Sequence, residues 1–395
     1  MSVRGTTAGA TSIPFWRNVR VLSWIGQAAF LLLVALVAAW LYGNVTAGMQ
    51  RIGIGGGYGF LNQSAGFEIG VKPVPYTPQD SYWRAFLVGV LNTLSVTVLG
   101  IVLATILGLL MGIAQLSSNW LIARLAQAYV AIFRNTPLLV QLLFWYLAVF
   151  LRLPRVQEAI ALPGPIYLSN RGVTMVGLVP TESFGVWLLL VLVGVAAGAA
   201  LWYFLRRAQE RTGLQSPRFL LALLVVALVA VAGWLVLAPS PLAVEVPERR
   251  GLNFRGGWQF VPEYAALLLG LVVYTGTFIA ENVRAGIQGV ARGQTEAAQA
   301  LGLSRGQVLR LVVLPQALRI IIPPTTSQYL NLAKNSSLAI AIGFPDLFNV
   351  SRTITNQTGQ VIQMIGLIMA SYLAISLTTS LLMNLYNRRV RLVER

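Results

Sequence analysis

Long apolar stretches recur along this chain, and short polar segments separate them. An α-helix needs about 20 apolar residues to cross a hydrocarbon core, because it rises about 1.5 Å per residue. Eight windows have this length, and they lie near 21–42, 85–113, 130–151, 186–205, 219–238, 263–283, 317–340 and 362–386. The pattern therefore predicts an all-α fold, a polytopic transmembrane helical bundle of about eight spans.

Composition agrees with a membrane protein. Hydrophobic residues make up 56% of the chain and charged residues only 10%, which is too little polar surface to cover a soluble fold of 395 residues. The first window follows Arg4, Arg17 and Arg20, as a signal peptide would. Its apolar run is longer than the roughly 7–15 residues of a signal core, so we interpret it as an uncleaved anchor.

The distribution of charge predicts the orientation. Cytoplasmic segments of membrane proteins are enriched in Lys and Arg. With a cytoplasmic amino terminus, 18 of the 29 basic residues fall in inside segments together with three acidic residues. The remaining 11 basic residues share the outside segments with eight acidic residues. We therefore predict that both termini, and the polar segment 293–315, face the cytoplasm.

Three of the predicted outside segments are long. The first, 43–84, contains "RIGIGGGYGF", whose glycines match neither a dinucleotide nor a phosphate-loop spacing, so we expect a flexible or interfacial loop. The other two contain "LPGP" and "APSP", where proline prevents a helix from continuing. We divide the chain into an anchor span with a Gly-rich loop, 1–84, and a transmembrane domain, 85–390, in which 152–262 is an inserted segment with an extra pair of spans.

Several chemistries are excluded by residues that the sequence lacks. It has no His and no Cys, which excludes His-based proton relays, thiol chemistry and any His or Cys metal site. Its lysines, Lys72 and Lys334, are not part of a G-x-x-x-x-G-K-[ST] phosphate loop. The basic residues are scattered at span ends and form no patch with stacking aromatics, so we expect no nucleic-acid partner. We predict no metal and no cofactor on this chain, and any ATP would have to be bound by another chain.

A short amphipathic segment, "GQTEAAQALGLSRGQVLRLVVLP" at Gly293–Pro315, stands out between two apolar windows. Thr295 can cap a helix whose first residue is Glu296, where a carboxylate favours the positive end of the helix dipole. Gly302 can supply the left-handed position that ends this helix after about two turns. We predict a helix, a glycine corner and a second helix.

The second helix has its own start signal. Ser304 and Gln307 have the spacing of an S-x-x-Q capping box, which predicts a helix running toward Pro315. A first helix of about seven residues is unstable alone in water and needs a surface on which to pack. That surface is either another protein or the membrane, whose anionic headgroups Arg305 and Arg310 would suit.

One pattern in this segment resembles a known family. The signature E-A-A, three residues, G, nine residues and I-x-L-P is typical of the integral-membrane subunits of bacterial ATP-binding-cassette (ABC) importers. Val312 replaces the usual Ile here, and the matching residues are Glu296, Ala297, Ala298, Gly302, Leu314 and Pro315. The resemblance implies that the first helix docks into a groove on a separate ABC ATPase subunit, which uses ATP and Mg and couples its closure to the membrane domain.

Three further segments resemble the polar amino-acid permeases, which serve histidine, glutamate, glutamine, arginine and opines. They are "LNTLSVTVLG" from Leu91, "FRNTPLLVQLLFWY" at Phe133–Tyr146 and "NLAKNSSLAIAIGFPDL" at Asn331–Leu347. The resemblance covers roughly 85–151 and 263–390, a core of five spans like that of ABC type I importers. The long form is similar to general L-amino-acid or glutamate/glutamine/aspartate/asparagine permeases. It implies a second permease subunit in a heterodimer, a periplasmic amino-acid-binding protein and the bacterial inner membrane.

Polar residues inside the apolar windows are candidates for the substrate pathway, because ionisable groups at membrane depth are costly. Lys334 lies about 22 Å beyond Arg319 if the helix between them is continuous, which places it toward the outer half of its span. With Asn335 and Ser336 it makes a polar cluster in an apolar helix. Lys334 either attracts a substrate carboxylate or extends to the outer headgroups, which costs little near a span end.

Two more candidate groups lie at the predicted inner ends of spans. Glu281 and Arg284 are one helical turn apart and form either a local salt bridge or part of an inner gate. Arg134, Asn135 and Thr136 precede a proline, which predicts a break at the inner start of the third span. Such a break can expose backbone groups for substrate binding or can simply turn the chain.

Two other function classes remain as alternatives. An ion-coupled secondary transporter or channel could use Glu281 and Lys334, but it gives no reason for a glycine-cornered helix pair. A membrane-embedded hydrolase needs a nucleophile and a base, and without His no such pair is visible. The leading prediction is a transport subunit rather than an enzyme, driven by ATP on a partner chain.

Overall fold

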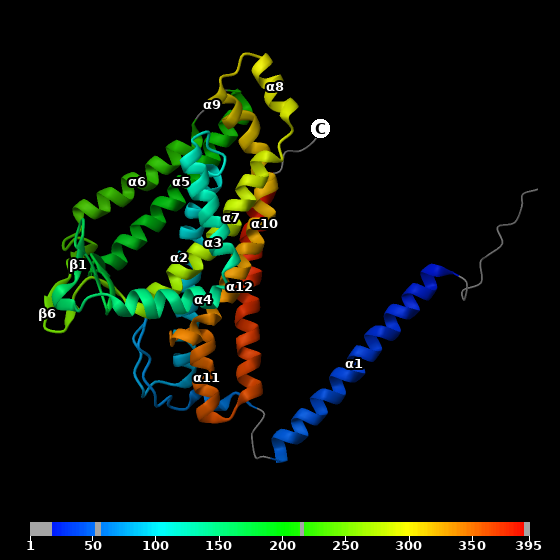
Figure 1. Ribbon diagram of the computed structural model, residues 1–395, viewed down its shortest axis with the longest axis vertical. Coiled ribbons are helices and arrows are strands. Elements are labelled where there is room, and N and C mark those ends of the chain that lie inside the picture. The colour runs from blue at the N-terminus through cyan, green and yellow to red at the C-terminus, as the bar shows by residue number, and fades with distance from the viewer. Residues whose placement is uncertain (1–17, 52–56, 214–216, 391–395) are drawn as a thin grey trace, which may run out of the picture.

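The computed structural model describes residues 18–51, 57–213 and 217–390, and most of these residues are helical (Figure 1). Within those residues, seven helices are long and apolar enough to cross a membrane, or eight if one bent helix pair counts as a span. The helices of these spans are α1 (Val19–Arg51), α2 (Tyr82–Ala114), α3 (Trp120–Asn135) with α4 (Leu138–Leu143), α5 (Phe184–Thr212), α6 (Arg218–Val236), α7 (Pro262–Gln288), α10 (Leu314–Asn335) and α12 (Val361–Val390). The predicted helical bundle of about eight spans is confirmed.

The third span differs from its predicted position. It begins at Trp120 rather than near residue 130, and the chain bends by 103° between Asn135 and Leu138. Arg124 and Gln127 lower the apolar character of the first half of α3, so a search for apolar windows began too late. Arg134 therefore lies at the far end of α3, and not at the start of a span as predicted.

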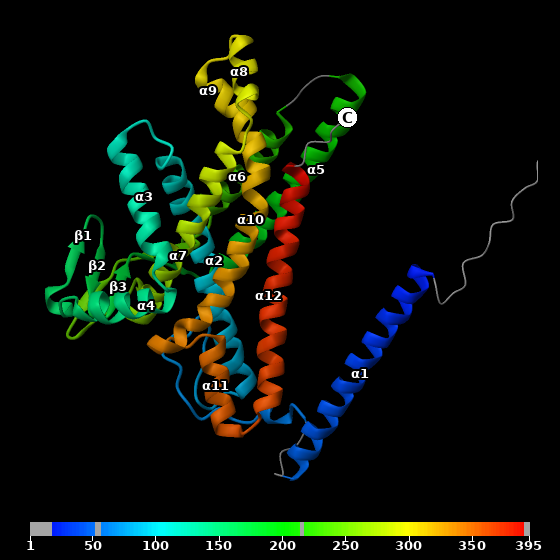
Figure 2. The ribbon, with the colours of Figure 1, turned by 45° about the vertical axis from the view of Figure 1, so that its right-hand side comes forward.

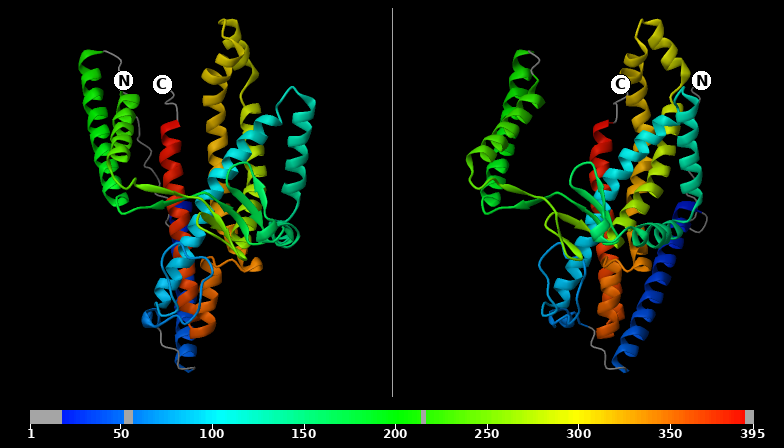
Figure 3. Two further views of the ribbon diagram at one scale, coloured as in Figure 1. Left: turned by 90° about the vertical axis from the view of Figure 1, so that its left-hand side faces the viewer. Right: turned by 60° about the vertical axis from the view of Figure 1, so that its left-hand side comes forward.

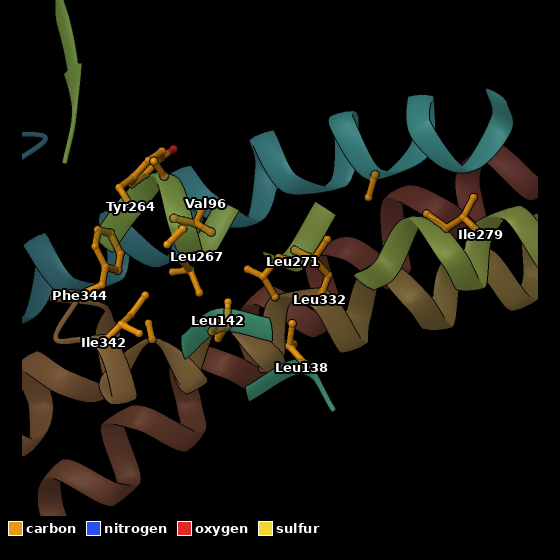
Figure 4. Close-up of a cluster of buried hydrophobic side chains, with 14 of the residues drawn as sticks. Val96, Leu138, Leu142, Tyr264, Leu267, Leu271, Ile279, Leu332, Ile342 and Phe344 are labelled. Carbon is orange, nitrogen blue, oxygen red and sulfur yellow. The ribbon is translucent and has the colours of Figure 1, made fainter. Parts of the chain in front are cut away.

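The core of the bundle is the contact between α2 and α7. Its glycines allow the two helices to approach closely, because a Cβ on Gly108 would lie 2.5 Å from the Cβ of Ile279 and one on Gly112 would lie 2.7 Å from the Cβ of Val283. Helix α10 packs against α7 from the other side, where Leu332 and Leu271 are fully buried (Figure 4). In lipid, such close packing of small residues is a main source of helix association.

A cap covers one end of the bundle, which we call the α11 end. It consists of residues 57–81, the 3-10 helix η7 (Ser336–Ile342) and α11 (Leu347–Thr358). On α2, Asn92 donates to the carbonyls of Val71 and Pro345, at 2.9 Å each, and the Thr93 hydroxyl accepts from the Leu347 amide at 2.9 Å. Two neighbouring polar residues thus tie the cap to the bundle.

The first predicted outside segment is more ordered than expected. Residues 52–56 of "RIGIGGGYGF" lie outside the described residues, but the chain from Gly57 onward packs on α2 and α11 rather than forming a flexible loop. It does so because Phe60, Leu61, Ile69 and Tyr76 are buried there. The other two long outside segments form small β-sheets, which the sequence analysis did not predict.

Among the described residues, eight short strands flank the α5–α6 hairpin along the chain, four before α5 and four after α6. Each sheet joins one side of the hairpin to the other or closes a local turn. Strand β3 pairs with β8, and β4 with β5, both antiparallel. The strands are β1 (Ile160–Leu162), β2 (Ile166–Ser169), β3 (Gly172–Met175), β4 (Gly177–Pro180), β5 (Leu242–Glu245), β6 (Glu248–Arg250), β7 (Asn253–Arg255) and β8 (Trp258–Phe260). Helices α5 and α6 pack mainly on each other and stand apart from the core bundle (Figure 3).

At the opposite end of the bundle, the short helices α8 (Arg292–Ala300) and α9 (Arg305–Val308) project beyond the long helices (Figure 2). We call this the α8–α9 end. Helix α1 stands apart from the core, and none of the most apolar window in its Val21–Gly48 segment is buried. Arg4 and Arg17 at one terminus, and Arg391 and Arg395 at the other, lie outside the described residues.

Candidate functional site

The segment at the α8–α9 end begins with a helix, as predicted, but the start differs. Helix α8 begins at Arg292, and its N-cap residue, Ala291, makes no side-chain cap. Thr295 lies inside the helix, so the prediction that it caps the helix is wrong. Glu296 therefore sits in the middle of α8 and gains little from the helix dipole, which acts on the first turn. The backbone bond from Gln294 to the Ala291 carbonyl, 3.0 Å, starts the helix instead.

The glycine corner is present. Gly302 has a φ of +80°, in the left-handed region that favours glycine. The Leu303 amide donates to the Ala298 carbonyl at 3.2 Å, and the Gly302 amide donates to the Gln299 carbonyl at 2.9 Å. This pair of bonds is the Schellman arrangement, which satisfies carbonyls that the end of a helix would leave free.

The predicted capping box is also present. The Ser304 amide donates to Oε1 of Gln307 at 2.9 Å, and the Gln307 amide donates to the Ser304 hydroxyl at 3.4 Å. The helix that follows does not stop near Pro315. It passes through a π-helical turn at Leu309–Val313 and continues as α10. The wider turn accommodates the missing amide of Pro315, which an unbroken α-helix would not.

A small apolar core holds α8 against α9. Ala298, Val308 and Val313 are buried in it, whereas Glu296 and Ala297 remain exposed. Of the two alanines, only Ala297 can therefore touch a partner directly. Leu301 is 82% exposed at the tip, beside the glycine corner. Sequence reasoning missed Leu301, although a large apolar residue directly before a helix-ending glycine was visible.

A second group of candidate residues forms one polar cluster. Nη2 of Arg284 lies 2.8 Å from Oε2 of Glu281, and Nη1 of Arg134 lies 3.8 Å from the same oxygen. The Arg134 guanidinium also lies over the ring of Phe278, 5.6 Å from its centroid. Arg284 reaches one turn further along α7 and donates to Gln288 at 2.9 Å. The structure thus brings together residues from α3 and α7 that the sequence placed in separate groups.

This cluster borders a cavity of about 460 Å³ between α3 and α7. Asn135, Gln115, Gln127 and Gln288 complete its polar lining, and the three glutamines were not predicted from the sequence. For two of them the signal was helical spacing, because Gln127 lies two helical turns before Arg134 and Gln288 lies two turns after Glu281. A polar stripe inside an apolar span is the pattern that would have identified them.

The other two candidate residues at the break, Asn135 and Thr136, use their side chains to bond to carbonyls of α3. Nδ2 of Asn135 donates to the Ala131 carbonyl at 2.8 Å, and the Thr136 hydroxyl donates to the Ile132 carbonyl at 2.8 Å. Gln141 of α4 donates to the carbonyl of Thr136 at 3.0 Å. The bend is therefore stabilised by side chains that satisfy the carbonyls near Pro137.

Lys334, Asn335 and Ser336 lie at the α11 end of α10, where the helix tightens into η7. The Lys334 side chain is exposed, and Asn335 is half-buried. Ser336 is fully buried and donates to the Ala333 carbonyl at 2.8 Å, so it lines no surface. Ile321 of α10 packs against Gly286 of α7, close to the Glu281–Arg284 cluster. Lys334 lies about 20 Å further along α10. The Lys334 group and the Glu281–Arg284 cluster are therefore separate.

Comparisons with known proteins place this geometry in a family. Residues 104–392 match the model of the binding-protein-dependent transport system inner membrane component. The chain is 45% identical over 394 residues to the putative amino-acid ABC transporter permease protein YhdX of Escherichia coli, covering 99% of each chain. It is 47% identical over 359 residues to the general L-amino acid transport system permease protein AapQ of Rhizobium johnstonii, covering 90% of this chain and 89% of that one.

The crystal structure of an amino acid ABC transporter with histidines is 22% identical, with a TM-score of 0.46, and the match covers 78% of this chain and 95% of that chain. The family model alone covers most of the chain, and the relatives extend the match to nearly its full length. The chain therefore belongs to the family of inner-membrane components of binding-protein-dependent transport systems.

Proposed function

We propose that this chain is a membrane-spanning permease subunit of an ATP-driven amino-acid importer. It forms half of the translocation pathway and couples to a separate ABC ATPase through α8 and its glycine corner. The observation that carries this proposal is the exposed tip of that corner, where Leu301 is 82% exposed between α8 and the capping box that starts α9. Two relatives of similar length are described as amino-acid permeases, which supports the substrate class.

The α8–α9 end faces the cytoplasm in this proposal, and both termini lie on that side. The ends of α5 and α6 next to their connecting turn carry Arg206, Arg207, Arg211 and Arg218, and the start of α8 adds Arg292. Such enrichment in arginine is typical of cytoplasmic segments. The α11 end then faces outward, toward a periplasmic amino-acid-binding protein.

A second permease subunit would explain why two charged side chains on the membrane helices of this chain are exposed. The Arg134 and Arg284 side chains are 48% and 34% exposed, on helices of the membrane bundle. Charged side chains do not face lipid at such depth, because their transfer into hydrocarbon is costly. They therefore border either a water-filled pathway or another subunit, as in a transporter built from two permeases, here a heterodimer of related chains.

The two polar groups take different roles in this pathway. Glu281, with Arg284 and Arg134, is suited to an inner gate, because a shared carboxylate can exchange one arginine for the other as α3 and α7 move. Asn135 and Thr136 hold the bend between α3 and α4 that this movement requires. Lys334 and Asn335 lie nearer the outer face, where an exposed ammonium group attracts a substrate carboxylate. ATP and Mg are used by the partner ATPase, and this chain binds no cofactor.

The proposal is tested by uptake into proteoliposomes that contain the chain, its ATPase, a second permease and the binding protein. We expect accumulation of labelled glutamate, glutamine or leucine only with internal ATP. Glu296→Arg should abolish it, because α8 presents Glu296 to the partner, whereas Glu210→Arg should not. Glu210 is the matched control, since it is 59% exposed at the end of α5. Uptake that follows an ion gradient and ignores ATP would instead support a secondary transporter or channel.

A further inference from the structure

Helix α1 is a full membrane span with no partner among the described residues. Its candidate span, Val21–Gly48, has 28 residues, and none of its most apolar window is buried. The helix stands apart from the bundle (Figures 1 and 2). Alanines near its midpoint, Ala35, Ala38 and Ala39, leave room for another helix to approach closely, which favours association in lipid.

The bundle has an apolar groove on its surface, and α1 is also apolar. The groove runs between α2 and α12, has a volume of about 600 Å³, and is closed at its base by Tyr329 of α10. Val98 and Val102 line it from α2, and Ala374 and Thr378 line it from α12. Among the described residues that line it, none is charged. The groove therefore accepts an apolar helix, and it is long enough to contact several of its turns.

The connection between α1 and the bundle brings the helix to this groove. Arg51 and Gly57 are six residues apart, so their Cα atoms lie within about 20 Å of each other. A Cβ on Gly366 of α12 would lie 3.5 Å from the Tyr58 hydroxyl, so the chain re-enters the bundle at the outer end of α12. From that point the groove leads along both α2 and α12 toward the α8–α9 end.

The lengths of the three helices agree with an antiparallel fit. Helix α1 has 33 residues, α2 has 33 and α12 has 30. At the rise of an α-helix, Val34, Val98 and Thr378 each lie about 25 Å from the outer end of their own helix. These positions therefore have the same depth when the three outer ends are aligned.

We propose that α1 of this chain docks into the groove between α2 and α12 of the same chain, antiparallel to both. This would make α1 a fixed part of the permease wall rather than a separate anchor. The other candidates for the groove are a lipid acyl chain and a helix of the second permease. Neither is brought to the groove by a short covalent connection, as α1 is.

The chain has no cysteine, so introduced pairs are its only thiols. Four consecutive positions cover one helical turn, and we would place one cysteine at Leu33, Val34, Ala35 or Leu36. Each is combined with Val98→Cys or with Thr378→Cys. A protease site placed in 52–56 separates α1 from the bundle after oxidation in membranes. The matched control pairs the same α1 positions with Leu228→Cys on α6, which is 59% exposed and also lies near the middle of a span.

We expect at least one of the four positions to keep the two fragments joined without reductant, several-fold more than the Leu228→Cys control, and to release them with reductant. Ala374→Trp, which fills the groove, should lower the yield with Val98→Cys without lowering the amount of protein in the membrane. A product with the mass of two chains would place α1 on another subunit and overturn the proposal. Cross-linking no higher than in the control would do the same and leave the groove to lipid.

Discussion

At the scale of single residues, the corner between α8 and α9 depends on positions with very different exposure. Gly302 has open space around it, so its requirement is conformational, and a side chain there would strain the left-handed backbone without any clash. Ala298 faces inward and Leu301 faces outward. The E-A-A pattern thus mixes residues that build the corner with residues that can contact a partner.

Leu301→Ala should weaken binding of the ATPase without harming the fold. Truncating an exposed apolar anchor removes contact area in the complex but leaves no cavity in the free chain. We expect a loss of affinity of about tenfold, measured by titration of the ATPase onto the permease in nanodiscs. Leu252→Ala is the matched control, because Leu252 is 72% exposed in the turn between β6 and β7. Equal affinity for both variants would remove Leu301 from the contact.

Lys334→Ala should change transport more than assembly. An exposed ammonium group near the outer face favours substrates with a free carboxylate on their side chain, so we expect the KM for glutamate to rise several-fold more than the KM for glutamine. Lys72→Ala is the control, because Lys72 pairs with Glu68 at 2.9 Å in the cap. Unchanged kinetics for both substrates would exclude Lys334 from the pathway.

Asp346 gives the cap a dependence on pH. It lies between η7 and α11, outside the membrane spans, with its side chain fully buried and Oδ1 accepting from the Asn349 amide at 2.8 Å. Burial raises the pKa of this carboxyl from 3.8 to about 6. The folded state therefore binds the proton more tightly than the unfolded state, and the free energy of unfolding falls as pH rises from about 4 to about 6.

Asp346→Asn keeps a capping oxygen and cannot ionise. We expect the free energy of unfolding of the parent chain to fall by about 2 kcal/mol between pH 4.5 and pH 7, with a lower Tm, and we expect the variant to lose this decrease. Thermal unfolding of the purified chain in detergent measures it. Parallel curves for the two proteins over this range would show that Asp346 does not ionise with a raised pKa.

At the scale of elements, apolar length predicted most spans because lipid imposes one length on every straight helix. It failed at α3, where the helix is amphipathic and carries Arg124, Gln127 and Arg134 on an exposed polar face. The proline at 137 did indicate the break, but not that the chain turns by 103°. Gln141 bonds to the carbonyls of Phe133 and Thr136 across the bend, contacts that a search for apolar windows does not detect.

The contact between α2 and α7 makes an element-scale prediction. A Cβ on Gly112 would lie 2.7 Å from the Cβ of Val283 and 2.8 Å from the Ala280 carbonyl oxygen, so the two helices would have to separate. Gly112→Ala should lower stability by about 1–3 kcal/mol, the usual cost of overpacking. Gly185→Ala on α5 is the control, because its Cβ would meet nothing within 4 Å. Equal Tm values for Gly112→Ala and Gly185→Ala in detergent would show that α2 and α7 can separate slightly without a loss of stability.

At the scale of the whole molecule, the sequence predicted the bundle, the corner and the family, because each depends on a local pattern. It did not predict the strands around the α5–α6 hairpin, where β3 pairs with β8 although both helices of the hairpin separate them along the chain. Nor did it join Arg134 to Glu281, since that contact requires α3 and α7 to be placed in space. Contacts that depend on the packing of distant segments therefore could not be predicted from the sequence.

Coupling between ATP hydrolysis and transport through the glycine corner is the central claim. It is tested most directly by measuring substrate accumulated per ATP hydrolysed in proteoliposomes containing the complete transporter, with Gly302→Ala compared with Gly306→Ala. Gly306 lies in α9, lacks a positive φ, and also has open space around its Cβ position. We predict that Gly306→Ala transports as the parent does and that Gly302→Ala hydrolyses ATP with little accumulation. Full accumulation by Gly302→Ala would contradict the account.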